Sequence, residues 1–139
     1  MTISKEIVDD IISLLKQCEF RKICDRYCAD DFLWTIKGSS VLSGPYKSKD
    51  DFFERVIGRL NKVLLPEWKM HILDYYVDND RDIFVVEMRG EMTAKNGADY
   101  NNEYCWIFKF SDNKIISITA YYDSLLVNKT LNENEVRYE

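Results

Sequence analysis

Residues 100–127 read YNNEYCWIFKFSDNKIISITAYYDSLLV, and this stretch predicts two long strands joined by a tight turn over residues 111–114. Aromatic and polar residues alternate along it, which is typical of strands with one buried face. Near its end stands a carboxylate, Asp123, on an otherwise apolar strand. Such a charge meets either solvent or an internal pocket, and which of the two holds decides the function.

The length of the turn predicts which residues of the two strands lie opposite each other. If Phe110 opposes Ile115 across the turn, counting outward places Asn102 opposite Asp123. The aromatic residues expected on the same face are Tyr104, Trp106 and Tyr121. The pairing therefore predicts one carboxylate beside one amide on an aromatic wall.

This pair of polar groups suits proton abstraction beside a carbonyl group. Desolvation by aromatic rings disfavours the charged form of a carboxylate, which would make Asp123 a stronger base. Asn102 would orient that base or donate to a developing oxyanion. The alternative is structural: Asp123 caps the loop after the last strand or accepts hydrogen bonds from backbone N–H groups.

The composition limits the class of protein. A chain of 139 residues is long enough for one domain with a real core, and its net charge of −5 without a basic cluster argues against a nucleic-acid partner. No apolar run approaches the ~18 residues of a membrane span. The N-terminal MTISKEIVDDIISLL predicts an amphipathic helix rather than a signal peptide, so we expect a cytoplasmic protein.

Cysteine and histidine usage predicts no metal site, and we expect no cofactor. The four cysteines form no C-x-x-C pair, and His71 is the single histidine. In a reducing compartment we expect the thiols to be unpaired and buried. They belong to Cys18, Cys24, Cys28 and Cys105.

Hydrophobic periodicity orders the rest of the chain. The expected helices cover about residues 3–18, 20–28 and 48–60, capped by Thr2 or Ser4 at the first and by Ser48 at the third. The other expected strands cover about residues 32–37, 68–77 and 83–93, and residues 128–139 read as a loose polar tail. Residues 1–139 are thus expected to form a single α+β domain, with N-terminal helices packed on a curved, mostly antiparallel sheet.

Three segments, in this order, resemble the nuclear transport factor 2-like superfamily and, within it, the SnoaL-like proteins. They are residues 20–34 with FRKI and CADD, residues 38–48 with LSGPY, and residues 100–123 with YNNEY, KI and YYD. The resemblance implies a cone whose sheet wraps around an internal pocket closed by the helices, often with a dimer through the outer sheet face. In active SnoaL-like cyclases, an aspartate at the position matched by Asp123 serves as the base.

Two enzyme relatives of that fold are matched less well. The first-strand aspartate of ketosteroid isomerase has no counterpart, because residues 35–37 read TIK. Arg89 and Glu91 resemble the arginine and acid on a middle strand of limonene-epoxide hydrolases, which also carry an aspartate near the end of the last strand. Glutamate replaces the aspartate of that pattern here.

Residues 96–97 are an Asn-Gly turn signal, and the register of the strands that they join distinguishes the acid–base chemistry of Asp123 from the epoxide-hydrolase chemistry. A loop of two or four residues would place Glu91 opposite Asn102, on the pocket side. An odd-length loop or a bulge would place Gly90 there and leave Arg89 outside. We prefer the second register, because it keeps the apolar faces of the strands together.

Three functions therefore remain open. The first is a cofactor-independent isomerase or cyclase that uses Asp123 as general base, with Asn102, on a small apolar carbonyl compound. The second is a non-catalytic ligand-binding or dimeric scaffold module, and the third is an epoxide-hydrolase-like enzyme using Arg89, Glu91 and Asp123. The residues expected in the ligand wall, or alternatively in the core or the sheet, are Trp34, Trp68, His71, Tyr104, Trp106 and Tyr121.

The same face assignment predicts a homodimer. Its motives are the family resemblance and four apolar residues assigned to the outer sheet face, namely Ile83, Val85, Ile107 and Ile118. An exposed apolar patch of this kind usually marks an interface.

Overall fold

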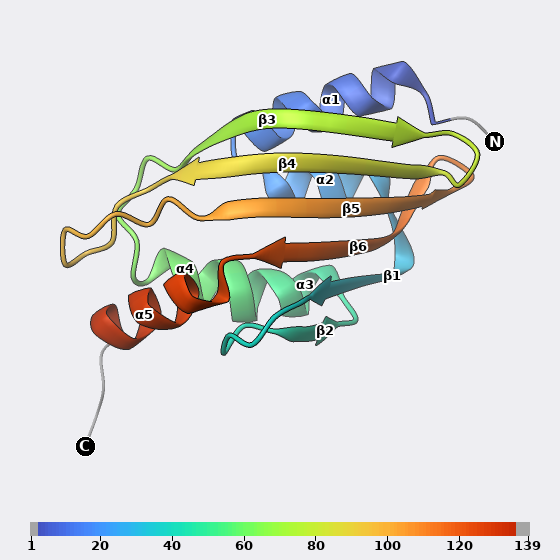
Figure 1. Cartoon of the computed structure of the whole chain (residues 1–139). Coiled ribbons are helices and arrows are strands. Elements are labelled where there is room, and N and C mark those ends of the chain that lie inside the picture. Colours follow the sequence, from blue (N-terminus) through green and yellow to red (C-terminus); the bar gives the residue numbers. More distant parts are fainter. Residues whose placement is uncertain (1–2, 136–139) are drawn as a thin grey trace.

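The structure is a computed structural model that describes residues 3–135. The helices and strands are, in chain order, α1 (Lys5–Lys16), α2 (Phe20–Tyr27), β1 (Cys28–Ile36), β2 (Gly44–Tyr46), α3 (Lys49–Phe52), the π-helical turn η1 (Phe53–Ile57), α4 (Gly58–Asn61), β3 (Lys69–Asp78), β4 (Ile83–Glu91), β5 (Glu103–Ser111), β6 (Lys114–Tyr122) and α5 (Ser124–Asn134) (Figure 1). None of the helices in this described part is long and apolar enough to cross a membrane.

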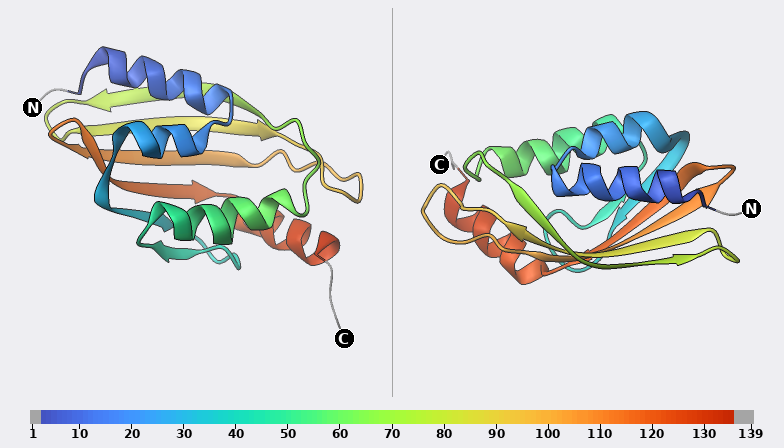
Figure 2. Two further views of the ribbon diagram at one scale, coloured as in Figure 1. Left: turned by 180° about the vertical axis from the view of Figure 1, so that it is seen from behind. Right: turned by 90° about the horizontal axis from the view of Figure 1, so that it is seen from above.

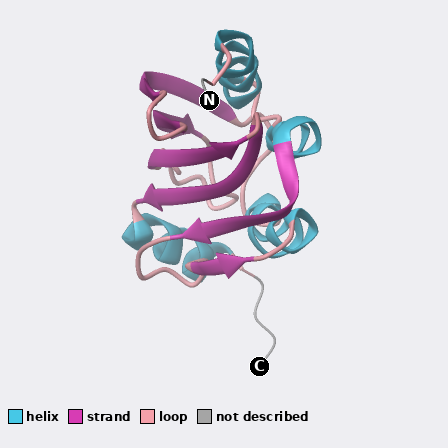
Figure 3. Cartoon of the chain, turned by 90° about the vertical axis from the view of Figure 1, so that its right-hand side faces the viewer, coloured by secondary structure: helices cyan, strands magenta, loops and turns pink. Residues whose placement is uncertain are grey.

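A curved sheet of six strands forms one layer, in the order β2-β1-β6-β5-β4-β3. All neighbouring strands are antiparallel except β1 and β6, which run parallel. The helices α1 and α2 and the continuous α3–η1–α4 segment cover one face of the sheet (Figure 2). Figure 3 shows the two layers from the side. The predicted α+β class, with helices on a curved and mostly antiparallel sheet, is confirmed.

The N-terminal helices begin where capping predicts. The Ser4 hydroxyl accepts a hydrogen bond from the Glu6 N–H (3.2 Å), and the Ser48 hydroxyl accepts one from the Asp51 N–H (3.0 Å). Thr2, the other candidate cap, lies outside the described residues. The buried residues of these helices recur at helical spacing and face the sheet: Val8, Ile11, Leu14, Leu15, Phe52, Val56 and Leu60.

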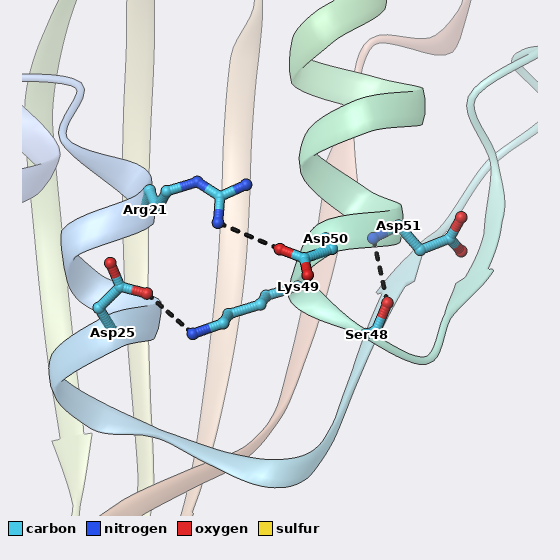
Figure 4. A network of polar contacts seen from close by, with 6 residues as sticks. All are labelled: Arg21, Asp25, Ser48, Lys49, Asp50 and Asp51. Carbon is cyan, nitrogen blue, oxygen red and sulfur yellow. Dashed lines mark hydrogen bonds and ion pairs between the residues drawn. The ribbon is translucent and has the colours of Figure 1, made fainter.

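Two ion pairs join α2 to the start of α3 (Figure 4). Arg21 contacts Asp50 (3.2 Å) and Lys49 contacts Asp25 (2.9 Å). All four side chains are at least 44% exposed, so each pair contributes on the order of 0–1 kcal/mol to stability. Apolar burial beneath these pairs therefore supplies most of the free energy that holds α2 and α3 together.

The turn between β5 and β6 is as predicted, but the pairing beyond it is not. Asp112 and Asn113 have φ values of 51° and 60°, which the two central residues of a tight hairpin turn require, and Phe110 pairs with Ile115. A β-bulge then follows, so that Lys109 pairs with Ser117. One extra residue on β6 exchanges the faces of all later residues on that strand.

The bulge makes two expected positions wrong. Tyr104 pairs with Tyr122 rather than Tyr121, which leaves Tyr121 on the outer face and 47% exposed. Ile118, expected outside, pairs with Phe108 and is buried under the helices. Successive side chains of a strand point to opposite faces of the sheet, so a shift of one position moves each later residue of β6 to the other face.

The preferred register between β4 and β5 is confirmed. Met88 pairs with Tyr104, and the Gly90 N–H donates to the Asn102 carbonyl oxygen (2.8 Å). Arg89 and Glu91 consequently lie on the outer face of the sheet, opposite the helices. Phe84 and Val86 continue the buried face of β4.

The expected loose tail from residue 128 is wrong up to residue 134, because residues 124–134 form α5. Three buried residues, Val127, Thr130 and Leu131, share the side of this helix that packs against the fold. The Arg59 guanidinium binds the Glu135 carboxylate through Nε (2.7 Å) and Nη2 (2.9 Å), just beyond the helix. Residues 136–139 of the expected tail lie outside the described residues.

Candidate ligand-binding cavity

A cavity of about 60 Å³ lies between the inner face of the sheet and the helices. Strands β1, β3, β5 and β6, helix α2, the α3–η1–α4 segment and α5 all contribute to its wall. The aromatic residues of that wall are Phe20, Trp34, Phe52, Trp68, Tyr100, Tyr104, Trp106 and Tyr122. Among the described residues that line it, none carries a carboxylate, an imidazole, an ammonium or a guanidinium group.

Trp34 is the centre of the aromatic wall. Its ring stacks on that of Phe52, with centroids 3.5 Å apart and planes at 9°. It also meets Trp106 in a T-shaped contact, with centroids 5.3 Å apart and planes at 84°. Trp106 in turn meets the Tyr104 ring edge-on at 6.2 Å. These contacts fix the positions of the rings, so this side of the cavity is preformed.

Two phenols of the wall, those of Tyr100 and Tyr104, act as neutral groups. Burial raises the pKa of Tyr104 well above its usual value, and desolvation also raises the pKa of Tyr100. Both phenols therefore stay protonated around neutral pH. The Tyr122 hydroxyl is hydrogen-bonded to the hydroxyls of Ser40 and Ser43, the latter at 3.0 Å, and so ties the loop after β1 to the end of β6.

Asp123 does not face the cavity, so its expected position in the pocket is wrong. Its side chain is exposed and its carboxylate accepts a hydrogen bond from the Leu126 N–H (3.1 Å), which makes it the N-cap of α5. The chain leaves the sheet after Tyr122 and turns into this helix, which carries the carboxylate outward. The alternative prediction, in which Asp123 has a structural capping role, agrees with the structure.

Asn102 does lie next to Asp123, but it contacts the backbone rather than the carboxylate. Its side-chain oxygen accepts from the Asp123 N–H (2.9 Å), and its amide nitrogen donates to the Asp123 carbonyl oxygen (3.2 Å) and to the Tyr100 hydroxyl (3.4 Å). The residue is fully buried and is not part of the cavity wall. Its amide thus joins the end of β6 to β5.

The other expected site residues divide by sheet face. Trp34, Trp68, Tyr104 and Trp106 line the cavity, as expected of a ligand wall. Tyr121 lies outside, and so does His71, which pairs with Arg89 across the outer face and places Nε2 3.4 Å from the Glu91 carboxylate. The set Arg89, Glu91 and Asp123, expected for an epoxide hydrolase, is therefore not assembled around the cavity.

A surface groove leads toward the cavity between α2 and the η1–α4 segment. Phe20, Ile57 and Trp68 line both the groove and the cavity, so they form the boundary between them. Two residues of the groove, Cys18 and Glu67, adopt left-handed backbone conformations, with φ of 56° and 76°. On this side of the wall, Trp68 and Ile57 are only half-buried.

Metal ligands and disulfides do not contribute to a site within residues 3–135. No cluster of histidine, cysteine, aspartate and glutamate side chains in this range could hold a metal ion. The four cysteines are free there, and Cys24 is the buried one, whereas Cys18, Cys28 and Cys105 are half-buried. Burial raises the pKa of the Cys18 thiol to about 11, so this groove residue is not an activated nucleophile.

The capping role of Asp123 makes a direct prediction. Asp123→Ala is expected to lower the free energy of unfolding by about 1 kcal/mol, because the Leu126 N–H loses its acceptor, whereas Asp123→Asn retains a good cap and should change it little. Lys129→Ala, an exposed change within the same helix, is the control. Urea denaturation measures all three; a loss of stability in Asp123→Asn equal to that in Asp123→Ala would contradict the capping role.

Comparisons with known proteins agree on the fold. The family model of the SnoaL-like domain matches residues 11–118. A solved nuclear transport factor 2-like protein from Burkholderia thailandensis is 18% identical, with a TM-score of 0.75 over 91% of this chain and 95% of that one. Candidate SnoaL-like polyketide cyclases from a Jannaschia species (12% identity, TM-score 0.73, 96% of each chain) and from Mesorhizobium loti (21%, 0.69, 88% of this chain and 100% of that one) are similar too. No curated protein matches the sequence.

Proposed function

The chain belongs to the SnoaL-like family, and from the cavity in its fold we propose that it binds a small, largely apolar molecule without acid–base catalysis. The observation that carries this proposal is the composition of the wall: aromatic and aliphatic side chains line the space, and none of the residues of the 3–135 range that line it carries a carboxylate or an imidazole. A concave, mostly apolar cavity with a few polar groups is what small-molecule sites require.

The volume of the cavity limits the ligand. An engineered protein cavity of about 150 Å³ holds one benzene molecule, and one water needs about 10–15 Å³. The 60 Å³ found here therefore suits a molecule of only a few heavy atoms. A larger ligand would have to displace the half-buried Trp68 and Ile57 at the groove.

The absence of a base in the wall argues against the isomerase or cyclase alternative. The carboxylate proposed as base, that of Asp123, is exposed and is engaged by the Leu126 N–H. The phenols of Tyr100 and Tyr104 have raised pKa values, which makes them hydrogen-bond donors rather than proton acceptors at neutral pH. Binding of a molecule that fits the cavity thus requires no movement of a carboxylate, whereas turnover would require one to move into the cavity.

Native mass spectrometry of protein purified from its own host tests the proposal. The expected result is one small molecule per chain, released on denaturation and identified in the organic extract, with Asp123→Asn protein carrying the same molecule in the same amount. Chains that carry no molecule, and that bind none of a panel of small apolar compounds, would contradict it.

We also propose that a second copy of the chain covers the outer face of the sheet. No helix covers this face within the described residues, and Leu73, Tyr76 and Tyr121 expose 47–59% of their surface on it. Val85 and Ile107 lie half-buried between them. Charges of both signs surround these residues, which suits a self-complementary, two-fold interface.

Sedimentation at micromolar concentration measures this association. The expected result is a dimer for the unaltered chain and a monomer for Tyr121→Glu, because a charge in the middle of an apolar interface is desolvated without a partner. Lys69→Glu, at the margin of the face, is the control and should remain dimeric. A monomer for the unaltered chain would exclude the interface.

A further inference from the structure

The cavity and the surface groove beside it share one boundary. Phe20, Ile57 and Trp68 line both spaces, which measure about 60 Å³ for the cavity and about 550 Å³ for the open groove. Phe20 is buried, whereas Ile57 and Trp68 are half-buried. Trp68 stands before β3 and outside any helix or strand, so its side chain can move without breaking a hydrogen bond of the sheet.

The two spaces differ in their polar groups. No charged side chain among residues 3–135 lines the cavity. The polar residues that line the groove are Gln17, Glu19, Arg21, Asn61 and Glu67. An apolar group gains from burial, whereas a charged group loses its hydration in an apolar cavity. A molecule that occupies both spaces must therefore have one apolar end in the cavity and one polar end in the groove.

The backbone of the groove is unusual at two places. The π-helical turn η1 is closed by a hydrogen bond from the Gly58 N–H to the Phe53 carbonyl oxygen, and Phe53, Ile57 and Gly58 all line the groove. Glu67 has a φ of 76°, in the left-handed region that a long side chain rarely adopts. Both features are found disproportionately at functional sites, so they favour a role for the groove in binding.

A negatively charged end is disfavoured in the groove. Arg21 is the one cationic side chain that lines it in the described part of the chain. Its guanidinium already contacts the Asp50 carboxylate at 3.2 Å (Figure 4), and it lies over the Phe53 ring, 4.5 Å from the centroid. An anionic ligand would compete with Asp50 for this group and would share the groove with Glu19 and Glu67.

A positively charged end has a partner available there. Glu19 is paired with Lys22 at 3.9 Å, but Glu67 is exposed and forms no ion pair within residues 3–135. The adjacent Trp68 adds an aromatic ring, whose face attracts cations. We propose that the ligand is a short-chain alkylamine, with its hydrocarbon end in the cavity and its ammonium group in the groove beside Glu67 and Trp68. This inference rests on the proposed binding function and adds the chemical class of the ligand.

Three compounds with equal numbers of carbon atoms test the charge of the polar end. At neutral pH n-hexylamine is a cation, 1-hexanol is neutral and hexanoate is an anion. Calorimetric titration is expected to give the highest affinity for the amine and the lowest for hexanoate. The difference between the amine and the alcohol should shrink at high salt, because the charges lie at the surface.

A pair of variants assigns the charge effect to one residue. Glu67→Gln is expected to lower the affinity for n-hexylamine by roughly 2- to 5-fold, the effect of an exposed ion pair, and to leave that for 1-hexanol unchanged. Glu54→Gln is the matched control, because Glu54 is an exposed carboxylate of η1 that lines neither the groove nor the cavity. It should change neither affinity.

Nuclear magnetic resonance locates the two ends of the ligand. The Ala120 methyl group belongs to a residue of the cavity wall, and the Asn61 side-chain amide belongs to a residue of the groove. n-Hexylamine is expected to shift both signals. Xenon, an apolar atom that enters dry protein cavities, is expected to shift the Ala120 signal alone.

Each outcome has a separate meaning. Equal affinities for the amine and the alcohol, or an equal loss in Glu67→Gln and Glu54→Gln, would overturn the proposed amine. A hexylamine shift at only one of Ala120 and Asn61 would overturn its position across the boundary. In these cases binding of xenon would leave the proposed binding function standing. Failure of both xenon and n-hexylamine to bind, with the fold intact, would overturn the binding function and this inference together.

Discussion

Asn102→Ala is expected to lower the free energy of unfolding by about 2–4 kcal/mol. The side chain is fully buried and makes hydrogen bonds to both backbone groups of Asp123 and to the Tyr100 hydroxyl. Alanine leaves the Asp123 N–H and carbonyl without these partners and opens a small void. Since this contact joins β5 to the start of α5, the loss should appear as a lower urea midpoint with no change in the dependence on urea.

The neighbouring Asn101 provides a matched control. Its side-chain oxygen accepts a single hydrogen bond, from the Met92 N–H (3.2 Å), so Asn101→Ala is expected to cost about 1 kcal/mol. An Asn102→Ala protein that is as stable as Asn101→Ala but binds ligand more weakly would contradict the structural role and return Asn102 to the ligand site.

Filling the cavity should abolish binding. Ala120 is 4% exposed, lies on the inner face of β6 opposite Trp106 and lines the space directly. Ala120→Leu adds three carbon atoms to a cavity of about 60 Å³, so the affinity for a small apolar compound that binds the unaltered chain is expected to fall at least about tenfold. Heteronuclear titration measures the affinity, and thermal unfolding checks that the fold is retained.

The control for that change lies one residue away. Thr119→Leu introduces the same side chain on the outer face of β6, opposite Ile107, where it cannot reach the cavity. Its affinity for the same compound should equal that of the unaltered chain. Unimpaired binding in Ala120→Leu, or an equal loss in Thr119→Leu, would place the ligand outside the cavity.

The part of the fold with strong local signals could be predicted from sequence. Ser4 and Ser48 start helices, Asp112 and Asn113 make the hairpin turn, and the apolar face of β4 fixes its pairing with β5. Each of these depends on residues close together in the chain or on a clear alternation of apolar and polar positions. The resemblance to the SnoaL-like family then supplied the architecture, which the comparisons confirm.

The site was predicted less well, and one bulge explains most of the difference. The pair Phe110 and Ile115 was correct, but the bulge just beyond it carries no local sequence signal, and counting across it put Tyr121 in the wall instead of Tyr122. The sequence of β6 does not resolve this, because Tyr121 and Tyr122 are adjacent and either one could pair with Tyr104. His71 was expected in the ligand wall but lies on the outer face. The sequence could not decide its face, because both faces of β3 are exposed over much of the strand.

Asp123 was misplaced because α5 was not expected. The segment after residue 127 is polar, and its buried apolar residues are only Val127 and Leu131; their spacing of four fits a helix but covers a single turn, which is too little to predict one. Tertiary contacts complete it: the Asn128 side chain accepts from the Val41 N–H (2.9 Å), and Glu135 binds Arg59. With the helix present, an aspartate before it is a common N-cap; without it, the same residue reads as a carboxylate at the end of a strand.

The most direct test of the account is a crystal structure of the protein purified, without unfolding, from its own host. We expect density for a small molecule in the cavity, in contact with Trp34, Trp106 and Tyr104, while the Asp123 carboxylate remains on the Leu126 N–H and away from the ligand. A molecule bound instead on the outer side of β6, with an atom within hydrogen-bonding distance of the Asp123 carboxylate, would contradict the claim that the cavity is the functional site.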